Sequence, residues 1–256
     1  MALWIVFTLL TIGLGVSATP VLAYDLSEVQ DGGTIAGRVV FVGPIPVLPP
    51  LTITKDQDIC GTTAASQVLL VSTENRGVKD TVIALEGISQ GKATPASQPT
   101  LDNRSCTMTP RVQAVMLGTE MIIQNSDPFL HTTRGRLPDS KQAFNLVFPR
   151  GTSPKEQKIR FPGVITVTCD THGHMRAYIL SFDQPYFAVT DENGRFHIEQ
   201  VPPGSYTLKA WHEGWQIVAY DPNGNPMYEA PYVVTREVRV TGGETTDVDL
   251  QLAARE

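Results

Sequence analysis

Residues 164–182 read VITVTCDTHGHMRAYILSF and place three kinds of metal-binding side chain between two apolar segments. Each apolar segment has the length and the β-branched content of a strand, so a short loop is expected between two strands. Cys169, His172 and Met175 provide a thiolate, an imidazole and a thioether around that loop. A trigonal Cys/His₂ site with a long axial Met is typical of copper. The stretch therefore predicts a β-protein with copper ligands on a loop between strands.

A second imidazole has to come from another part of the chain. His131 ends the sequence MIIQNSDPFLH of residues 121–131, where an apolar strand runs into a polar bend. We therefore predict four ligands to one copper ion: His131, Cys169, His172 and Met175. Taken alone, Cys169 would be read as a buried structural thiol, and Met175 as a residue that fills a gap in the core. The cluster favours a metal site, and its Met favours copper over zinc.

This part of the chain resembles the cupredoxins, above all amicyanin and the plastocyanins. GTEMIIQN at residues 118–125 resembles the family's strand before the first His, and Cys169, His172 and Met175 match a C-x₂-H-x₂-M loop of the amicyanin kind. The resemblance implies a Greek-key β-sandwich with one type 1 copper that transfers single electrons. It covers residues 110–182 well and residues 33–109 only loosely.

Two positions depart from the family pattern. Thr132 stands where cupredoxins often have an Asn that tethers the Cys loop, and Gly173-His174 replaces a frequent Pro-aromatic pair. Both Thr132 and His174 are therefore accessory candidates: Thr132 through its hydroxyl group, and His174 as a competing imidazole that we expect to be exposed to solvent. The edge of His172 is expected at the surface, where it would pass the electron.

A second motif begins after residue 184. DENGRF at residues 191–196 and VPPGSYTL at residues 201–208 combine turn residues with alternating apolar residues. They resemble the carboxypeptidase regulatory-like, transthyretin-like domain, which implies a small β-sandwich over residues 184–256. With the copper loop before it, the arrangement also resembles methylamine-utilisation-type exported proteins. His212 lies beside two tryptophans, and we expect Glu213 or a backbone group to satisfy it rather than a metal.

Strand patterns dominate the whole chain, which predicts an all-β fold. The first domain is predicted over residues 24–183. Within it, residues 24–109 either extend the cupredoxin sheet or form a separate lobe; the alternation at residues 78–85 favours the extension, and residues 88–101 are expected to be a surface loop. The predicted strands are 34–42, 78–85, 112–124, 143–148, 157–161, 165–168, 177–182, 195–198, 206–211, 234–240 and 246–252.

The N-terminal segment indicates export. Residues 1–23 contain no charged residue and end in Val-Leu-Ala, as in a secretory signal peptide, although an uncleaved membrane anchor is the alternative. We expect the protein in the periplasm of a bacterium or otherwise outside the cell. Because thiols outside the cytosol tend to pair, Cys60 and Cys106, both in polar turn-like sequence, are predicted to form a disulfide. Three free thiols are the alternative.

Charge and spacing exclude several classes of function. The formal net charge is −6, and the sequence has no cluster of Lys and Arg that could follow a phosphate backbone. We therefore expect no nucleic acid as a partner. Cys169 and His172 share one loop, unlike the Cys and His of thiol hydrolases, so we expect no enzyme. The predicted partner is a redox protein. The alternatives are a copper-binding or copper-delivery protein without redox turnover, and an exported β-protein without metal.

Overall fold

Strands make up nearly all the regular structure of the chain. The computed structural model describes residues 24–94, 96–221 and 226–255, and α1 (Gln57–Cys60) is the one helix within them. No helix in these ranges has the length and apolar character needed to cross a bilayer. The predicted all-β fold is confirmed, whereas the predicted signal peptide lies outside the described residues.

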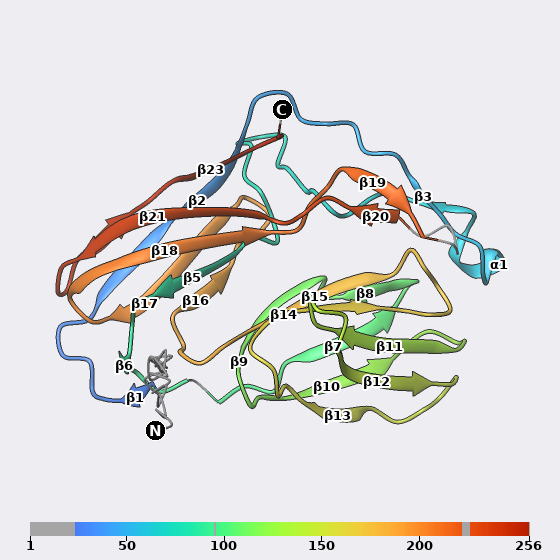
Figure 1. Cartoon of the computed structure of the whole chain (residues 1–256), viewed down its shortest axis with the longest axis horizontal. Coiled ribbons are helices and arrows are strands. Elements are labelled where there is room, and N and C mark those ends of the chain that lie inside the picture. Colours follow the sequence, from blue (N-terminus) through green and yellow to red (C-terminus); the bar gives the residue numbers. More distant parts are fainter. Residues whose placement is uncertain (1–23, 95, 222–225, 256) are drawn as a thin grey trace, which may run out of the picture.

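Residues 100–182 form a β-sandwich, here called the central unit (Figure 1). One sheet has the order β13-β10-β7-β8 and the other the order β12-β11-β14-β15-β9; β7 runs parallel to β10, and β9 runs parallel to β15. Its strands are β7 (Thr100–Arg104), β8 (Thr107–Thr109), β9 (Val112–Met116), β10 (Glu120–Asn125), β11 (His131–Arg136), β12 (Gln142–Phe148), β13 (Lys155–Lys158), β14 (Gly163–Thr168) and β15 (Arg176–Phe182). The two sheets enclose a core of apolar side chains.

Two predictions for this unit need correction. The single strand predicted over residues 112–124 is two strands in different sheets, because a turn redirects the chain at Gly118, whose φ is 88°. The predicted loop over residues 88–101 runs into β7, where Leu101 is fully buried. Polar and turn-forming residues precede Leu101 and hide the start of this strand from a sequence pattern.

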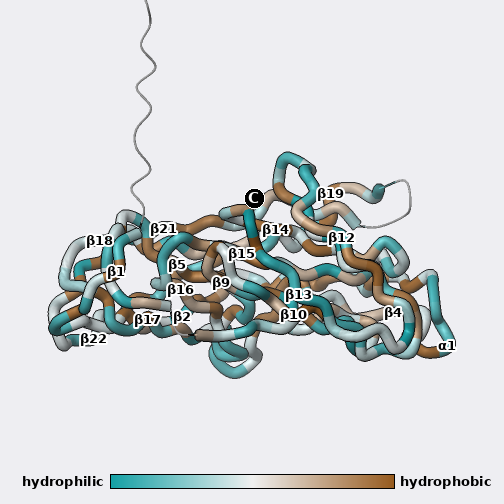
Figure 2. Tube along the Cα trace, turned by 90° about the horizontal axis from the view of Figure 1, so that it is seen from below, coloured by the Kyte–Doolittle hydropathy of each residue, from teal (hydrophilic) through white to brown (hydrophobic). Residues whose placement is uncertain are grey.

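The remaining long strands form a second sandwich, here called the flanking unit. Its sheets have the orders β16-β5-β18-β21 and β17-β2-β22, with β23 also paired to β2. The strands are β2 (Gly33–Val42), β5 (Val82–Glu86), β16 (Phe187–Val189), β17 (Arg195–Val201), β18 (Gly204–His212), β21 (Tyr232–Val240), β22 (Thr245–Asp247) and β23 (Leu250–Ala253). Short two-stranded pairs are β1 (Asp25–Leu26) with β6 (Gln90–Gly91), and β19 (Ile217–Tyr220) with β20 (Pro226–Tyr228). Figure 2 shows the two units side by side along the long axis.

Strands β2 and β5 come from the N-terminal third of the chain but complete the flanking unit. β2 pairs antiparallel with β17, and β5 lies between β16 and β18. The prediction that residues 24–109 extend the sheet of the metal-binding domain is therefore wrong for both strands. Alternating burial along β2 shows that one face of the strand is covered, but alternation does not specify which sheet the strand joins.

Residues 43–64, here called the arm, connect the flanking unit with the far end of the central unit (Figure 1). The arm contains β3 (Leu51–Thr52), α1 and β4 (Thr63–Ala64), and β3 pairs with β4. Cys60 at the end of α1 forms a disulfide with Cys106, which lies between β7 and β8. The predicted disulfide is therefore present, and it fixes the arm to the central unit.

The junction of the two units combines apolar packing with a buried ion pair. Val82 and Trp211 of the flanking unit pack with Val112, Tyr178 and Leu180 of the central unit. Beside them, Arg111 donates from Nε and Nη2 to the two carboxylate oxygens of Glu213, at 2.7 and 2.8 Å. Such a two-point contact fixes both distance and orientation, so the ion pair aligns the two sandwiches.

His212 ends β18 and is buried in the flanking unit. Its Nδ1 donates to the backbone oxygen of Glu213 at 2.8 Å, as expected for an imidazole satisfied by a backbone group. Burial lowers the pKa of His212 to about 4, because the charged imidazole is not stabilised by water at this buried position.

The low pKa of His212 makes the stability of the protein depend on pH. Between its ordinary pKa of 6.5 and the folded value of about 4, the unfolded chain binds the proton and the folded chain does not. Lowering the pH from about 7.5 to about 5 should therefore remove about 2 kcal/mol of unfolding free energy. Urea denaturation at both pH values of wild type and His212→Gln checks this, since the variant should lose that part of the pH dependence. His197→Gln, at an exposed position of β17, should keep it; equal pH dependence in all three proteins would contradict the expectation.

Candidate metal centre

Three predicted ligands meet at one end of the central unit. His131 is the first residue of β11, and Cys169 directly follows β14. These strands are antiparallel neighbours, so the start of one lies beside the end of the other. The ligand atoms of His131, Cys169 and His172 lie within 4.8 Å of one another, and all three residues are buried. The structure therefore brings together residues that are 38 positions apart in the sequence.

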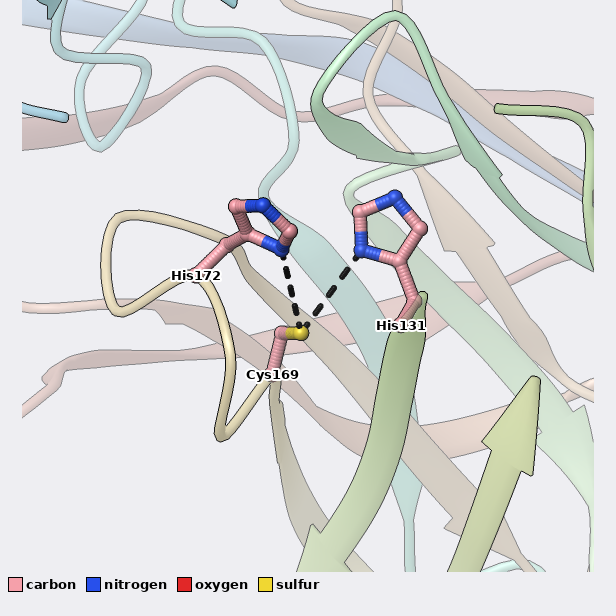
Figure 3. A group of neighbouring side chains, drawn as sticks. All are labelled: His131, Cys169 and His172. Atoms are coloured by element: carbon pink, nitrogen blue, oxygen red, sulfur yellow. Dashed lines mark hydrogen bonds between the residues drawn. The ribbon is translucent and has the colours of Figure 1, made fainter. Parts of the chain in front are cut away.

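Both imidazole rings point their Nδ1 atoms at the sulfur of Cys169 (Figure 3). The Sγ–Nδ1 distance is 3.6 Å to His131 and 3.7 Å to His172. A metal ion that is bonded in a plane to a thiolate at roughly 2.3 Å and to an imidazole nitrogen at roughly 2.0 Å holds these two atoms about 3.7 Å apart. The arrangement of the three side chains therefore fits a trigonal Cys/His₂ metal site.

A carboxylate holds the other nitrogen of each histidine. His131 Nε2 lies 3.0 Å from Asp127 Oδ2, and His172 Nε2 lies 2.8 Å from Asp56 Oδ2. In each pair the Nε2–H donates to the carboxylate, so that Nδ1 is the ring nitrogen that faces Cys169 and would bind a metal ion. Metal-binding histidines are usually oriented in this way, and the contact makes the imidazole a stronger ligand.

Sequence reasoning missed both carboxylates. Asp127 lies four residues before His131 in the polar bend, and its oxygens also accept from the backbone N–H groups of Ser105 and Cys106 at 2.7 and 2.9 Å. The spacing of four residues between Asp127 and His131 was the sequence signal for this contact. Asp56 is 116 residues from His172 and gave no local signal.

The environment of Cys169 favours its thiolate form. Burial raises the pKa of this thiol. Hydrogen bonds from His131, His172 and two backbone N–H groups lower the pKa by more than burial raises it, so that the pKa falls to about 5. At neutral pH the side chain is then ionised, which is the form that binds a metal. Among the described residues, Cys169 is the one cysteine outside a disulfide.

The fourth predicted ligand and Thr132 lie around this cluster. Met175 is 2 % exposed and packs in the same core as Cys169, and its backbone N–H donates to His172 O at 2.9 Å. Thr132 Oγ1 accepts from Asp170 N at 2.7 Å and lies 3.8 Å from Cys169 Sγ. Thr132 thus tethers the Cys loop to the start of β11, as the Asn of the family pattern was expected to do.

Two predictions about exposure are wrong. His172 is 1 % exposed, because Asp56 covers its Nε2 and the half-buried ring of Phe129 lies 5.3 Å from its own ring, so its edge does not lie at the surface. His174 is half-buried rather than exposed, and its Nε2 donates to the backbone oxygen of Cys106 at 3.1 Å. It lies outside the cluster of three ligands. In both cases a contact from a distant segment covers the loop.

One protein-family model matches part of the chain. Residues 166–253 match the model of the carboxypeptidase regulatory-like domain, a match that begins within β14. No curated protein matches the sequence.

Several solved structures show partial similarity. A Cu-containing nitrite reductase from Thermus scotoductus is 20 % identical over 36 % of this chain and 24 % of its own, with a TM-score of 0.29. A purple cupredoxin from Nitrosopumilus maritimus is 17 % identical over 33 % of this chain and all of its own, with a TM-score of 0.29. Amicyanin from Paracoccus versutus is 11 % identical over 35 % of this chain and 85 % of its own, with a TM-score of 0.30. The chain thus spans about a quarter of the nitrite reductase.

The C-terminal part of this all-β chain therefore contains a carboxypeptidase regulatory-like domain. Cupredoxins are among the solved structures to which the chain is partly similar.

Proposed function

We propose that the chain is an exported type 1 copper protein that transfers one electron at a time to or from a redox partner protein, and that it is not an enzyme. The observation that carries this proposal is the convergence of Cys169 Sγ with the Nδ1 atoms of His131 and His172. These three residues would hold copper, with Met175 as the fourth ligand. Bound copper would supply a one-electron Cu(I)/Cu(II) couple.

The protein's own groups prepare this site for a metal. Cys169 is ionised at neutral pH, and both imidazoles are held with Nδ1 facing its sulfur. A site that is held in one geometry limits the rearrangement that accompanies a change of oxidation state. Because His172 is covered, we place the path of the electron at Phe129, whose half-buried ring lies 5.0 Å from the ring of His131 and 5.3 Å from that of His172.

The visible absorption spectrum after addition of Cu(II) tests the proposal. Wild type should show an intense thiolate-to-copper band and should bleach and recover on reduction and reoxidation. Cys169→Ala should lack the band completely, because the sulfur that gives rise to it is gone. His174→Ala is the matched control on the same loop and should keep the band, since His174 Nε2 donates to the backbone oxygen of Cys106 and the side chain supplies no ligand atom to the cluster.

Other outcomes separate the alternatives. Colourless Cu(I) that exchanges readily would indicate copper binding or delivery without redox turnover. Copper bound without the band in both wild type and Cys169→Ala would contradict electron transfer through this site. No copper binding at all would leave an exported β-protein without metal.

A further inference from the structure

We propose that Asp56 is a positioning residue for the metal centre: the arm carries it across from the flanking unit to orient His172 and to close the solvent side of that ligand. This inference rests on the proposed copper site. It assigns a role in that site to a segment outside the central unit, which itself supplies all four predicted ligands.

The exposed fractions of the two side chains indicate that Asp56 lies between His172 and solvent. The side chain of His172 is 0 % exposed, whereas that of Asp56 is 38 % exposed. The 2.8 Å contact between Asp56 Oδ2 and His172 Nε2 joins the two. Asp56 therefore forms the outer layer over the one imidazole nitrogen that does not face Cys169.

The arm holds Asp56 in this place by covalent and hydrogen bonds. Asp56 O accepts from the N–H groups of Ile59 and Cys60 at 3.0 and 2.8 Å, and Cys60 is bonded to Cys106. Asp56 itself has a φ of 50°, a left-handed conformation that costs most residues energy but that Asp tolerates comparatively well. The position thus combines an uncommon backbone conformation with an acidic side chain aimed at a ligand.

The same disulfide connects the supports of both histidines. Cys106 N donates to Asp127, which holds His131, while Cys60 lies one turn from Asp56, which holds His172. A change in the arm is therefore expected to reach the ligands directly. Losing the Asp56 contact should weaken His172 as a ligand to Cu(II) and shift the reduction potential upward, because the imidazole becomes a poorer donor.

Four proteins test this role: wild type, Asp56→Gly, Asp56→Asn and Asp58→Asn. Asp56→Gly removes the carboxylate but suits the left-handed backbone, so strain does not confuse the result. Asp56→Asn keeps an acceptor oxygen without the charge. Asp58→Asn is the matched control, because Asp58 lies two residues away on α1 and is exposed.

Two readouts are measured on each protein. With copper, Asp56→Gly should bind Cu(II) about 10–100-fold more weakly than wild type and show a higher reduction potential, with Asp56→Asn in between. Without metal, the thiol of Cys169 should react several-fold faster with a disulfide reagent in Asp56→Gly, because the cover over the site is opened. Asp58→Asn should match wild type in both.

The outcomes separate this inference from the proposed function. A wild-type protein with the copper band, but with unchanged affinity, potential and thiol reactivity in Asp56→Gly, would overturn the role of Asp56 and leave the copper site standing. A wild-type protein without the band, but with a faster thiol reaction in Asp56→Gly, would remove the copper function and support the covering role. Equal effects of Asp58→Asn and Asp56→Asn would also overturn the inference.

Discussion

Replacing Glu213 with alanine should lower the free energy of unfolding by about 3–5 kcal/mol, because it leaves the guanidinium of Arg111 buried without a counter-charge. The two side chains are 9 % and 3 % exposed, and Arg111 also donates from Nη1 to the backbone oxygen of Arg176 at 3.0 Å. Arg176 directly follows Met175, so the loss should also disturb the exit of the loop that carries Cys169, His172 and Met175. Urea denaturation of both proteins measures the difference.

An exposed ion pair in the same molecule provides the control. Lys209 and Glu86 are 2.8 Å apart with side chains that are 41 % and 49 % exposed. Glu86→Ala should therefore cost no more than about 1 kcal/mol. The double change Arg111→Met with Glu213→Leu should recover most of the stability lost in Glu213→Ala, since no unpaired charge is buried. A loss in Glu213→Ala as small as that in Glu86→Ala would show that the ion pair does not hold the junction.

Removing the disulfide with the double change Cys60→Ser and Cys106→Ser should lower the free energy of unfolding by about 4 kcal/mol. The bond closes a loop with a sequence separation of 46, and its loss gives the unfolded chain more freedom. The change should also release the arm, so that Cys169 reacts faster with a thiol reagent in the metal-free protein. Chemical denaturation and the thiol reaction are measured on the same samples.

Reduction of the wild-type protein is the matching experiment without a mutation. Mild reductant should reproduce the stability loss of the double variant and should have no further effect on that variant. An unchanged unfolding free energy in the double variant would mean that the arm does not depend on its covalent bond. A stability loss without faster reaction of Cys169 would mean that the bond stabilises the fold but does not hold the cover.

Several features could be predicted from short-range patterns in the sequence alone. Alternating apolar residues and turn residues determined the all-β fold, because strand periodicity is local. The spacing of Cys169 and His172 determined that both reach one point, because three residues of loop cannot separate them far. His131 and the Cys60–Cys106 pair followed from residue type and context, without information about distance.

The pairing of the strands and the surroundings of the predicted ligands depend on long-range contacts that no local pattern indicates. β2 and β5 join C-terminal strands rather than the sheets of the central unit, because backbone hydrogen bonds between strands are the same for any sequence and periodicity specifies only a buried face. The burial of His172 likewise depends on Asp56, which arrives from a distant segment. A long-range contact of this kind leaves no periodic signal, since it depends on where the arm crosses the folded molecule and not on the residues next to either partner.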